Sequence, residues 1–264
     1  MEQLIKRKIM FRQSLVFTFL ISCSFSAFAQ KSDNIFHYSV MDAMRNSVYD
    51  GEITIADLKK NGDFGLGTYN FLDGELLALD GVFYRIAPDG KVIVAEDSRK
   101  SPFAAMAFFK FDKKIEIKGG KNMDSFLLAL KHLLPSNNQP YAIKIECEWD
   151  EISVGGATKV TENDTLGLAE KMKTRPIYTA KKIKGTLVGF YNPAYAGGID
   201  LSPFHFHFIS NDKKFGGHLV SGQLSNTVLN ILLDEKTGYT MELPKKSKRF
   251  NESWKAENNG KSTY

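Results

Sequence analysis

Cysteine and histidine are both scarce in this chain of 264 residues, which contains two of the first and five of the second. Two cysteines are too few for a disulfide-built scaffold or a four-thiolate zinc ribbon. The rest of the composition is ordinary, since 43% of the residues are apolar and 25% are charged. These fractions exclude disorder as the main state and are typical of a protein that buries one large core or two small ones.

The N-terminus has the pattern of an export signal. Basic residues from Lys6 to Arg12 precede the apolar stretch Leu15–Ile21, which is too short to cross a bilayer, and Ala27-Phe28-Ala29 fits a small-x-small cleavage site. We therefore expect a signal peptide over residues 1–29 and an exported protein, periplasmic or secreted. The alternatives are a buried N-terminal helix and a lipoprotein signal in which Cys23 carries a lipid anchor.

The formal charge of +5 belongs mostly to this signal. Residues 1–29 hold four basic side chains and one acidic one, so their removal leaves a nearly balanced chain of +2. We expect no nucleic-acid partner, and the remaining basic run, Lys245–Arg249, is expected to be a solvated segment. Cleavage also leaves Cys147 as a single cysteine, which excludes a disulfide within the mature chain.

Most of the mature chain alternates in the manner of β-strands. Asp80-Gly81 predicts a two-residue hairpin turn, and Asp124–Leu134 predicts an amphipathic helix that ends at a proline. Residues 32–60 have a helical pattern, in which Val40, Met44 and Val48 share one face. Runs of strands with few helices favour an α+β fold with mixed or antiparallel sheets.

The domain organisation predicted from composition has two β-rich halves. Residues 30–150 form an N-terminal α+β half, and residues 181–264 form a C-terminal half that carries most of the histidines. The polar, mixed segment 151–180 is expected to be a variable connection between them, with a short helix near its end.

Three of the five histidines lie within fourteen residues, at His205, His207 and His218. In a strand over Phe204–Ile209, the period of two places His205 and His207 on one face and the intervening phenylalanines on the other. A turn ending in Gly216-Gly217 then returns His218 to the same point. Three imidazoles leave an open position on a metal ion, which is the pattern of a catalytic zinc site. His37 and His132 are expected to be surface or core residues.

The sequence resembles the alpha-acetolactate decarboxylase family over most of residues 36–244. The resemblance rests on a set of short matching segments: Val48–Gly51, Gly62–Asn70, Leu72–Leu76, Tyr141–Ile143, Gly185–Phe190 and the block from His205 to His218. It implies a two-part α+β fold, a homodimer and one zinc ion in each chain.

The resemblance also implies roles for particular residues. His205, His207 and His218 match the zinc ligands, Glu75 matches a glutamate near the metal, and Thr68 matches a position that lines the substrate site. Glu257 is the best candidate for the family's C-terminal catalytic glutamate, and Glu252 is the next. Without the resemblance, Glu75 would be read as a solvent-facing carboxylate at the start of a strand.

The activity implied is that of a carbon–carbon lyase which converts 2-acetolactate to acetoin. The small-molecule substrate, a 2-hydroxy-3-oxo acid, would chelate zinc, and the metal would stabilise the enediolate left when carbon dioxide departs. Glu75 and a C-terminal glutamate would share the transfer of the proton to carbon.

One departure from the family concerns an arginine that binds the substrate carboxylate. Its position falls near Gly155, where this chain has none, and Lys159 or Arg175 are the candidates to replace it from elsewhere. This departure puts the substrate in question, and a three-histidine metal site also suits other chemistry, so three alternatives stay open. They are a non-catalytic metal-binding relative, a decarboxylase for a different 2-hydroxy-3-oxo acid, and a zinc hydratase or hydrolase.

Overall fold

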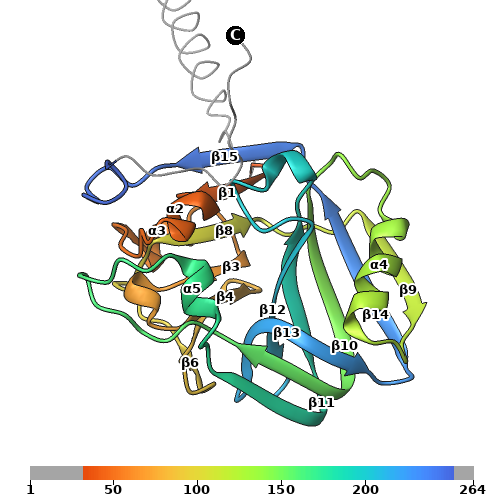
Figure 1. Ribbon diagram of the computed structural model, residues 1–264. Helices are drawn as coiled ribbons and strands as arrows, with labels where there is room; N and C mark the ends of the chain where they lie inside the picture. Colours follow the sequence, from red (N-terminus) through yellow and green to blue (C-terminus); the bar gives the residue numbers. More distant parts are fainter. Residues whose placement is uncertain (1–31, 253–264) are drawn as a thin grey trace, which may run out of the picture. The chain divides into compact units, whose positions relative to one another are not determined.

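The computed structural model describes residues 32–252 (Figure 1). The predictions for the signal peptide, Cys23 and Glu257 lie outside these residues. In the described range no helix is long and apolar enough to cross a membrane. The elements are, in chain order, β1 (Asn34–Tyr38), α2 (Met41–Arg45), β2 (Ile53–Thr54), α3 (Ile55–Leu58), β3 (Phe64–Thr68), η1 (Asn70–Leu72), β4 (Glu75–Leu79), β5 (Val82–Ile86), β6 (Val92–Val94), β7 (Lys100–Ser101), β8 (Phe103–Ala107), β9 (Lys113–Lys118), α4 (Met123–Leu133), β10 (Tyr141–Gly155), α5 (Leu168–Met172), β11 (Ile177–Tyr191), η2 (Ala194–Ala196), β12 (Phe204–Ser210), β13 (Gly216–Leu224), β14 (Val228–Glu235) and β15 (Gly238–Glu242).

The first large sheet has seven strands in the order β15-β1-β8-β3-β4-β5-β6. The β1–β15 pair is parallel, and the other pairs of this sheet are antiparallel. The predicted hairpin is confirmed, because Leu79 pairs with Val82 around Asp80 and Gly81, whose φ angles are 51° and 80°. Positive φ at both central residues is the geometry that favours Asp-Gly in a tight hairpin.

The helical pattern predicted for residues 32–60 is wrong in its first part. Strand β1 occupies Asn34–Tyr38, and helices appear only at α2 and α3. Ile35 packs into one apolar cluster and Phe36 into another, so the strand is buried on both faces. A strand buried in this way loses the apolar–polar alternation that would distinguish it from a helix.

The second large sheet has six strands in the order β11-β12-β13-β10-β14-β9. Strand β10 also pairs with β11 along its whole length, from Tyr141↔Tyr191 to Gly155↔Ile177, which joins β10, β11, β12 and β13 in a closed ring. Strands β9 and β10 belong to this sheet and β15 belongs to the first. The sheets therefore do not divide at the halves expected from composition.

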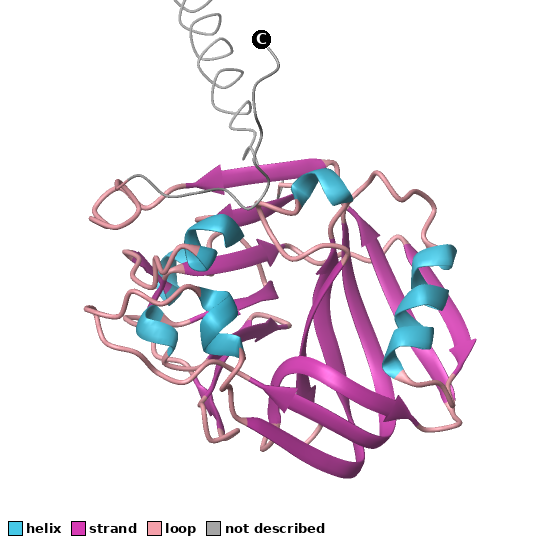
Figure 2. Cartoon of the chain, in the orientation of Figure 1, coloured by secondary structure: helices cyan, strands magenta, loops and turns pink. Residues whose placement is uncertain are grey.

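The two sheets pack against each other, and helices cover their outer faces (Figure 2). Phe64 and Leu66 of β3 share one buried cluster with Val188 and Phe190 of β11. On the far side of the second sheet, Phe126 and Leu130 of α4 pack against strand residues such as Trp149. Helix α4 matches the predicted helix to within a residue at each end. Its first turn is capped by the Asn122 side chain, which accepts from the Ser125 N–H at 2.9 Å.

The described residues form two large sheets and a few short helices, which confirms the predicted α+β fold class.

Candidate metal centre and active site

Strands β12 and β13 bring the three clustered histidines together. His205 and His207 lie on one face of β12, while Phe206 and Phe208 enter the core on the other, as the period of two predicts. His218 lies directly across from His207 in the β12–β13 register. The three ring centroids are 5.2–5.3 Å apart, and one ligand nitrogen from each residue lies within 4.8 Å of the others. The triad could therefore bind a metal ion.

Two of these rings are held in a defined tautomer. His205 Nδ1 donates to Asp200 Oδ1 at 2.7 Å, and His207 Nδ1 donates to the Leu76 carbonyl at 2.9 Å. Because Nδ1 carries the proton in each case, Nε2 retains its lone pair. This is how metal-binding histidines are oriented by the groups behind them.

The charge states also suit a metal. Burial, and next the proximity of the His205 and His218 rings, lowers the pKa of His207 well below its usual range. Burial lowers the pKa of His218 to about 3, assisted by His205 and Arg175. Both imidazoles are therefore neutral at pH 7, the form that binds metal ions. The donor set fits a divalent transition metal.

Thr68 and Glu75 approach the histidines from the first sheet. They are paired residues of β3 and β4, and Thr68 Oγ1 donates to the Gly74 carbonyl at 2.9 Å. Glu75 Oε2 lies 3.5 Å from His207 Nε2, and the Glu75 side chain is only 15% exposed. The carboxylate therefore faces the pocket, although it stands at the start of a strand.

The environment of Glu75 brings the pKa of its carboxyl group close to neutral pH. Burial raises the pKa of Glu75 to about 8, although the Ala157 N–H that donates to it and the charge of Arg175 both act in the opposite direction. A group with its pKa near neutrality can give or take a proton under working conditions.

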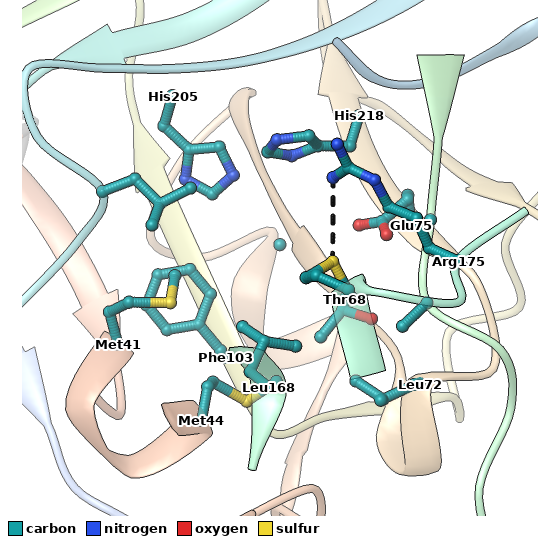
Figure 3. Close-up of a pocket in the computed structure, with 15 residues that line it drawn as sticks. Met41, Met44, Thr68, Leu72, Glu75, Phe103, Leu168, Arg175, His205 and His218 are labelled. Atoms are coloured by element: carbon teal, nitrogen blue, oxygen red, sulfur yellow. Dashed lines mark hydrogen bonds between the residues drawn. The ribbon is translucent and has the colours of Figure 1, made fainter. Parts of the chain in front are cut away.

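Arg175 supplies a positive charge to the same pocket. It lines the cavity with Thr68, Glu75, His205 and His218, and its Nη1 lies 3.7 Å from Met172 Sδ, the contact drawn as a dashed line in Figure 3. Lys159, the other candidate from the sequence, is 61% exposed and has its Nζ 3.5 Å from Asp73 Oδ1. The structure therefore brings Arg175 to the site and leaves Lys159 outside it.

Comparison with known proteins decides the family. The family model described as alpha-acetolactate decarboxylase matches residues 35–254. The chain belongs to the alpha-acetolactate decarboxylase family. The enzyme of that name from Bacillus licheniformis is 35% identical over 212 residues, which are 80% of this chain and 83% of that protein. The Methanosarcina mazei enzyme is 32% identical over 220 residues, covering 83% and 75% of the two chains.

A solved structure agrees with the family assignment. The crystal structure of alpha-acetolactate decarboxylase from Bacillus subtilis strain 168 superposes with a TM-score of 0.78 at 33% identity, covering 83% of this chain and 93% of that one. Membership of this family makes the chain a carbon–carbon lyase of the decarboxylase type.

Sequence reasoning missed the apolar wall of the decarboxylase pocket. Figure 3 shows Met41, Met44 and Phe103 on the side of the pocket away from Glu75 and Arg175. The full apolar lining comes from well-separated segments and comprises Met41, Met44, Leu72, Phe103, Ala157, Leu168, Met172 and Leu201. Isolated apolar residues carry no motif, so only the folded chain reveals them as a wall.

Among the described residues, no candidate for the family's C-terminal glutamate lines the histidine pocket. Glu252 lines a separate cavity with Asp50, Phe71, Lys248 and Arg249, and does not line the histidine pocket. Asp200, which orients His205, had no sequence motif to point to it.

Proposed function

We propose that this chain catalyses the zinc-dependent decarboxylation of 2-acetolactate to acetoin. The observation that carries the proposal is the convergence of three histidines, Glu75 and Arg175 on one pocket. Proteins that bear the decarboxylase name match this chain over most of both lengths, which supports the same substrate here.

His205, His207 and His218 would hold the metal, with zinc the first choice for a set of three imidazoles. When bound, such an ion supplies Lewis-acid stabilisation of the negative charge that the loss of carbon dioxide leaves on the substrate oxygens. The protein contributes the preparation of the ligands, because Asp200 and the Leu76 carbonyl already hold His205 and His207 in the required tautomer.

Arg175 binds the substrate carboxylate in this proposal. A guanidinium group can hold both carboxylate oxygens at once, which fixes the direction of the bond that will break. Its fixed positive charge favours the acid over neutral molecules of similar size.

Glu75 handles the proton that replaces the carboxyl group on carbon. Its carboxyl lies 3.5 Å from His207 Nε2 and lines the same pocket as Arg175, and burial raises its pKa to about 8, so the group can hold or release a proton near neutral pH. The apolar wall opposite suits the methyl groups of the substrate and excludes water from the reacting carbon.

The test is to give racemic acetolactate to purified mature chain beginning at Gln30, with zinc, and to measure acetoin. Activity well above that of a His205→Ala variant supports the proposal. Stoichiometric zinc without acetoin would favour the non-catalytic alternative, and turnover of only other 2-hydroxy-3-oxo acids would change the substrate.

Export and dimer formation belong to the same proposal. The pattern of residues 1–29 supports a signal peptide cleaved after Ala29, or a lipid anchor at Cys23. N-terminal sequencing and mass spectrometry of the protein from its native host distinguish cleavage at these two positions. Light scattering of the purified protein gives its oligomeric state.

A further inference from the structure

Asp200 is a fully buried carboxylate directly behind the candidate metal ligand His205. It lies between η2 and β12 and is 0% exposed. Its Oδ1 accepts from His205 Nδ1 and from the Leu201 N–H, both at 2.7 Å. Its Oδ2 has no hydrogen-bond partner among the described residues. A buried carboxylate oxygen without a hydrogen-bond donor lowers the stability of the folded state, so a donor to Oδ2 is expected nearby.

His37 of β1 shares a neighbour with His205, because both rings pack against Phe103, at centroid distances of 6.0 and 6.4 Å. The His37 side chain is 0% exposed, and neither ring nitrogen has a partner in the described part of the chain. The ring packs between Phe103 and Tyr239, at centroid distances of 6.0 and 5.6 Å. Burial lowers the pKa of His37, and the negative charge of the Asp200 carboxylate acts in the opposite direction.

We propose that Asp200 and His37 are positioning residues for the metal ligand His205. Asp200 fixes the His205 ring through Nδ1, and His37 holds the other carboxylate oxygen through one buried water molecule. The inference rests on the proposed metal site of this chain and adds the layer of residues behind it.

His37 and Asp200 carry complementary hydrogen-bonding groups. Neutral His37 has one N–H to donate, Asp200 Oδ2 lacks a donor, and both are sealed from bulk water. A buried water molecule is stable where it finds two or more such polar partners. A carboxylate held in this way makes Nε2 of His205 a more basic metal ligand and keeps that nitrogen directed at the metal.

The test measures zinc affinity of the full chain by competition with a chromogenic chelator. Asp200→Asn is expected to weaken zinc binding by about 10- to 100-fold, the usual effect of losing such a partner. His37→Phe is expected to weaken it less, and His37→Gln, which keeps an N–H, to recover most of the loss. The double variant Asp200→Asn with His37→Phe should match Asp200→Asn alone, because His37 acts only through the carboxylate.

A second measurement needs no variant. Long-range ¹H–¹⁵N correlation spectra of the metal-free wild-type protein should show His205 as a single tautomer protonated at Nδ1. A wild-type His205 protonated at Nε2 would overturn the proposal even if Asp200→Asn failed to fold.

The matched control is Asp234→Asn, which removes another buried carboxylate, paired with Lys236 at 2.8 Å on β14. It should lower thermal stability and leave zinc affinity unchanged. The same behaviour from Asp200→Asn would show a purely structural role and defeat the inference. A wild-type chain that binds no metal would instead defeat the proposed function, so the two failures are distinguishable.

Discussion

The side chain of Arg175 lies over the backbone of Gly155. A β-carbon built on Gly155 would stand 3.7 Å from Arg175 Cδ and 2.8 Å from the Pro176 carbonyl oxygen. Gly155 also pairs with His218 on one side and Ile177 on the other, so the guanidinium stem passes beside the histidine cluster. The resemblance places an arginine near Gly155; here the glycine leaves space, and the charge arrives from the segment before β11.

Replacing Arg175 tests this placement. Arg175→Gln is expected to reduce kcat/KM for acetolactate by about 100-fold, because a charge-assisted contact of about 2–3 kcal/mol is lost. Arg175→Lys should recover part of the activity through its point charge. Inhibition by acetoin, which has no carboxylate, should be unchanged in both variants. Lys159→Gln is the control and should behave as wild type; a larger loss there than in Arg175→Gln would reverse the assignment.

Glu75→Gln keeps the size of the side chain and removes the proton exchange. We expect kcat to fall by about 10²- to 10⁴-fold, the range typical of a lost general acid–base group. Bound zinc, measured by atomic emission, should stay at the wild-type level, because the three histidines are intact. Wild-type kcat in Glu75→Gln would remove this residue from the chemistry.

Gly156 controls the position of the Glu75 carboxyl. A β-carbon at Gly156 would lie 2.8 Å from Glu75 Oε1, closer than packed atoms allow. Gly156→Ala should therefore displace the carboxyl and lower kcat by at least 10-fold with zinc content unchanged, since small misplacements of reacting groups are expensive. Gly197→Ala, where the nearest atom is 3.4 Å away, is the matched control and should leave kcat unaltered.

His218→Ala removes one candidate metal ligand and one source of stability. Zinc that binds only the folded state should add about 4 kcal/mol to the free energy of unfolding at a thousandfold excess over Kd. The melting temperature of the wild type should rise accordingly. His218→Ala should lose most of this zinc-dependent increase. His132→Ala, at an exposed position on α4, should keep it. Equal zinc-dependent shifts in the two variants would exclude His218 as a ligand.

Asp73 gives the fold a specific pH dependence. Burial alone would raise its pKa, but hydrogen bonds from Arg85 and Arg99 lower it below the usual value of 3.8. A lowered folded-state pKa means that the stabilisation is complete above the unfolded value and is lost as the pH falls through the folded one. Asp73→Asn should cost about 1–2 kcal/mol at pH 7 and progressively less below about pH 4. Denaturant titrations at pH 7 and pH 3 measure the difference, and a cost that does not shrink at pH 3 would contradict this account.

Local spacing was sufficient to predict the parts of the site that lie on one hairpin. His205, His207 and His218 needed only strand periodicity and a Gly-Gly turn. The hairpin at Asp80-Gly81 and helix α4 were also predictable, because turn chemistry and amphipathic spacing are local signals.

The remaining parts depend on contacts between distant segments. Nothing in the sequence around Arg175 indicates that it lines the same pocket as Glu75, since that arrangement requires both sheets and the pairing of β10 with β11. Strand β1 was mistaken for a helix because burial on both faces removes the alternation that marks a strand. Asp200 and His37, which are 0% exposed and far apart in sequence, likewise needed the folded chain.

The parallel pairing of β1 with β15 constrains the order in which the first sheet can form. Asn34 Nδ2 donates to Thr240 Oγ1 at 3.1 Å, although the residues are 206 positions apart. The first strand therefore acquires one of its two neighbours only when nearly the whole chain has left the ribosome. A chain that stops before Gly238 would leave β1, and with it His37, on an unpaired sheet edge, where strands of other molecules could add.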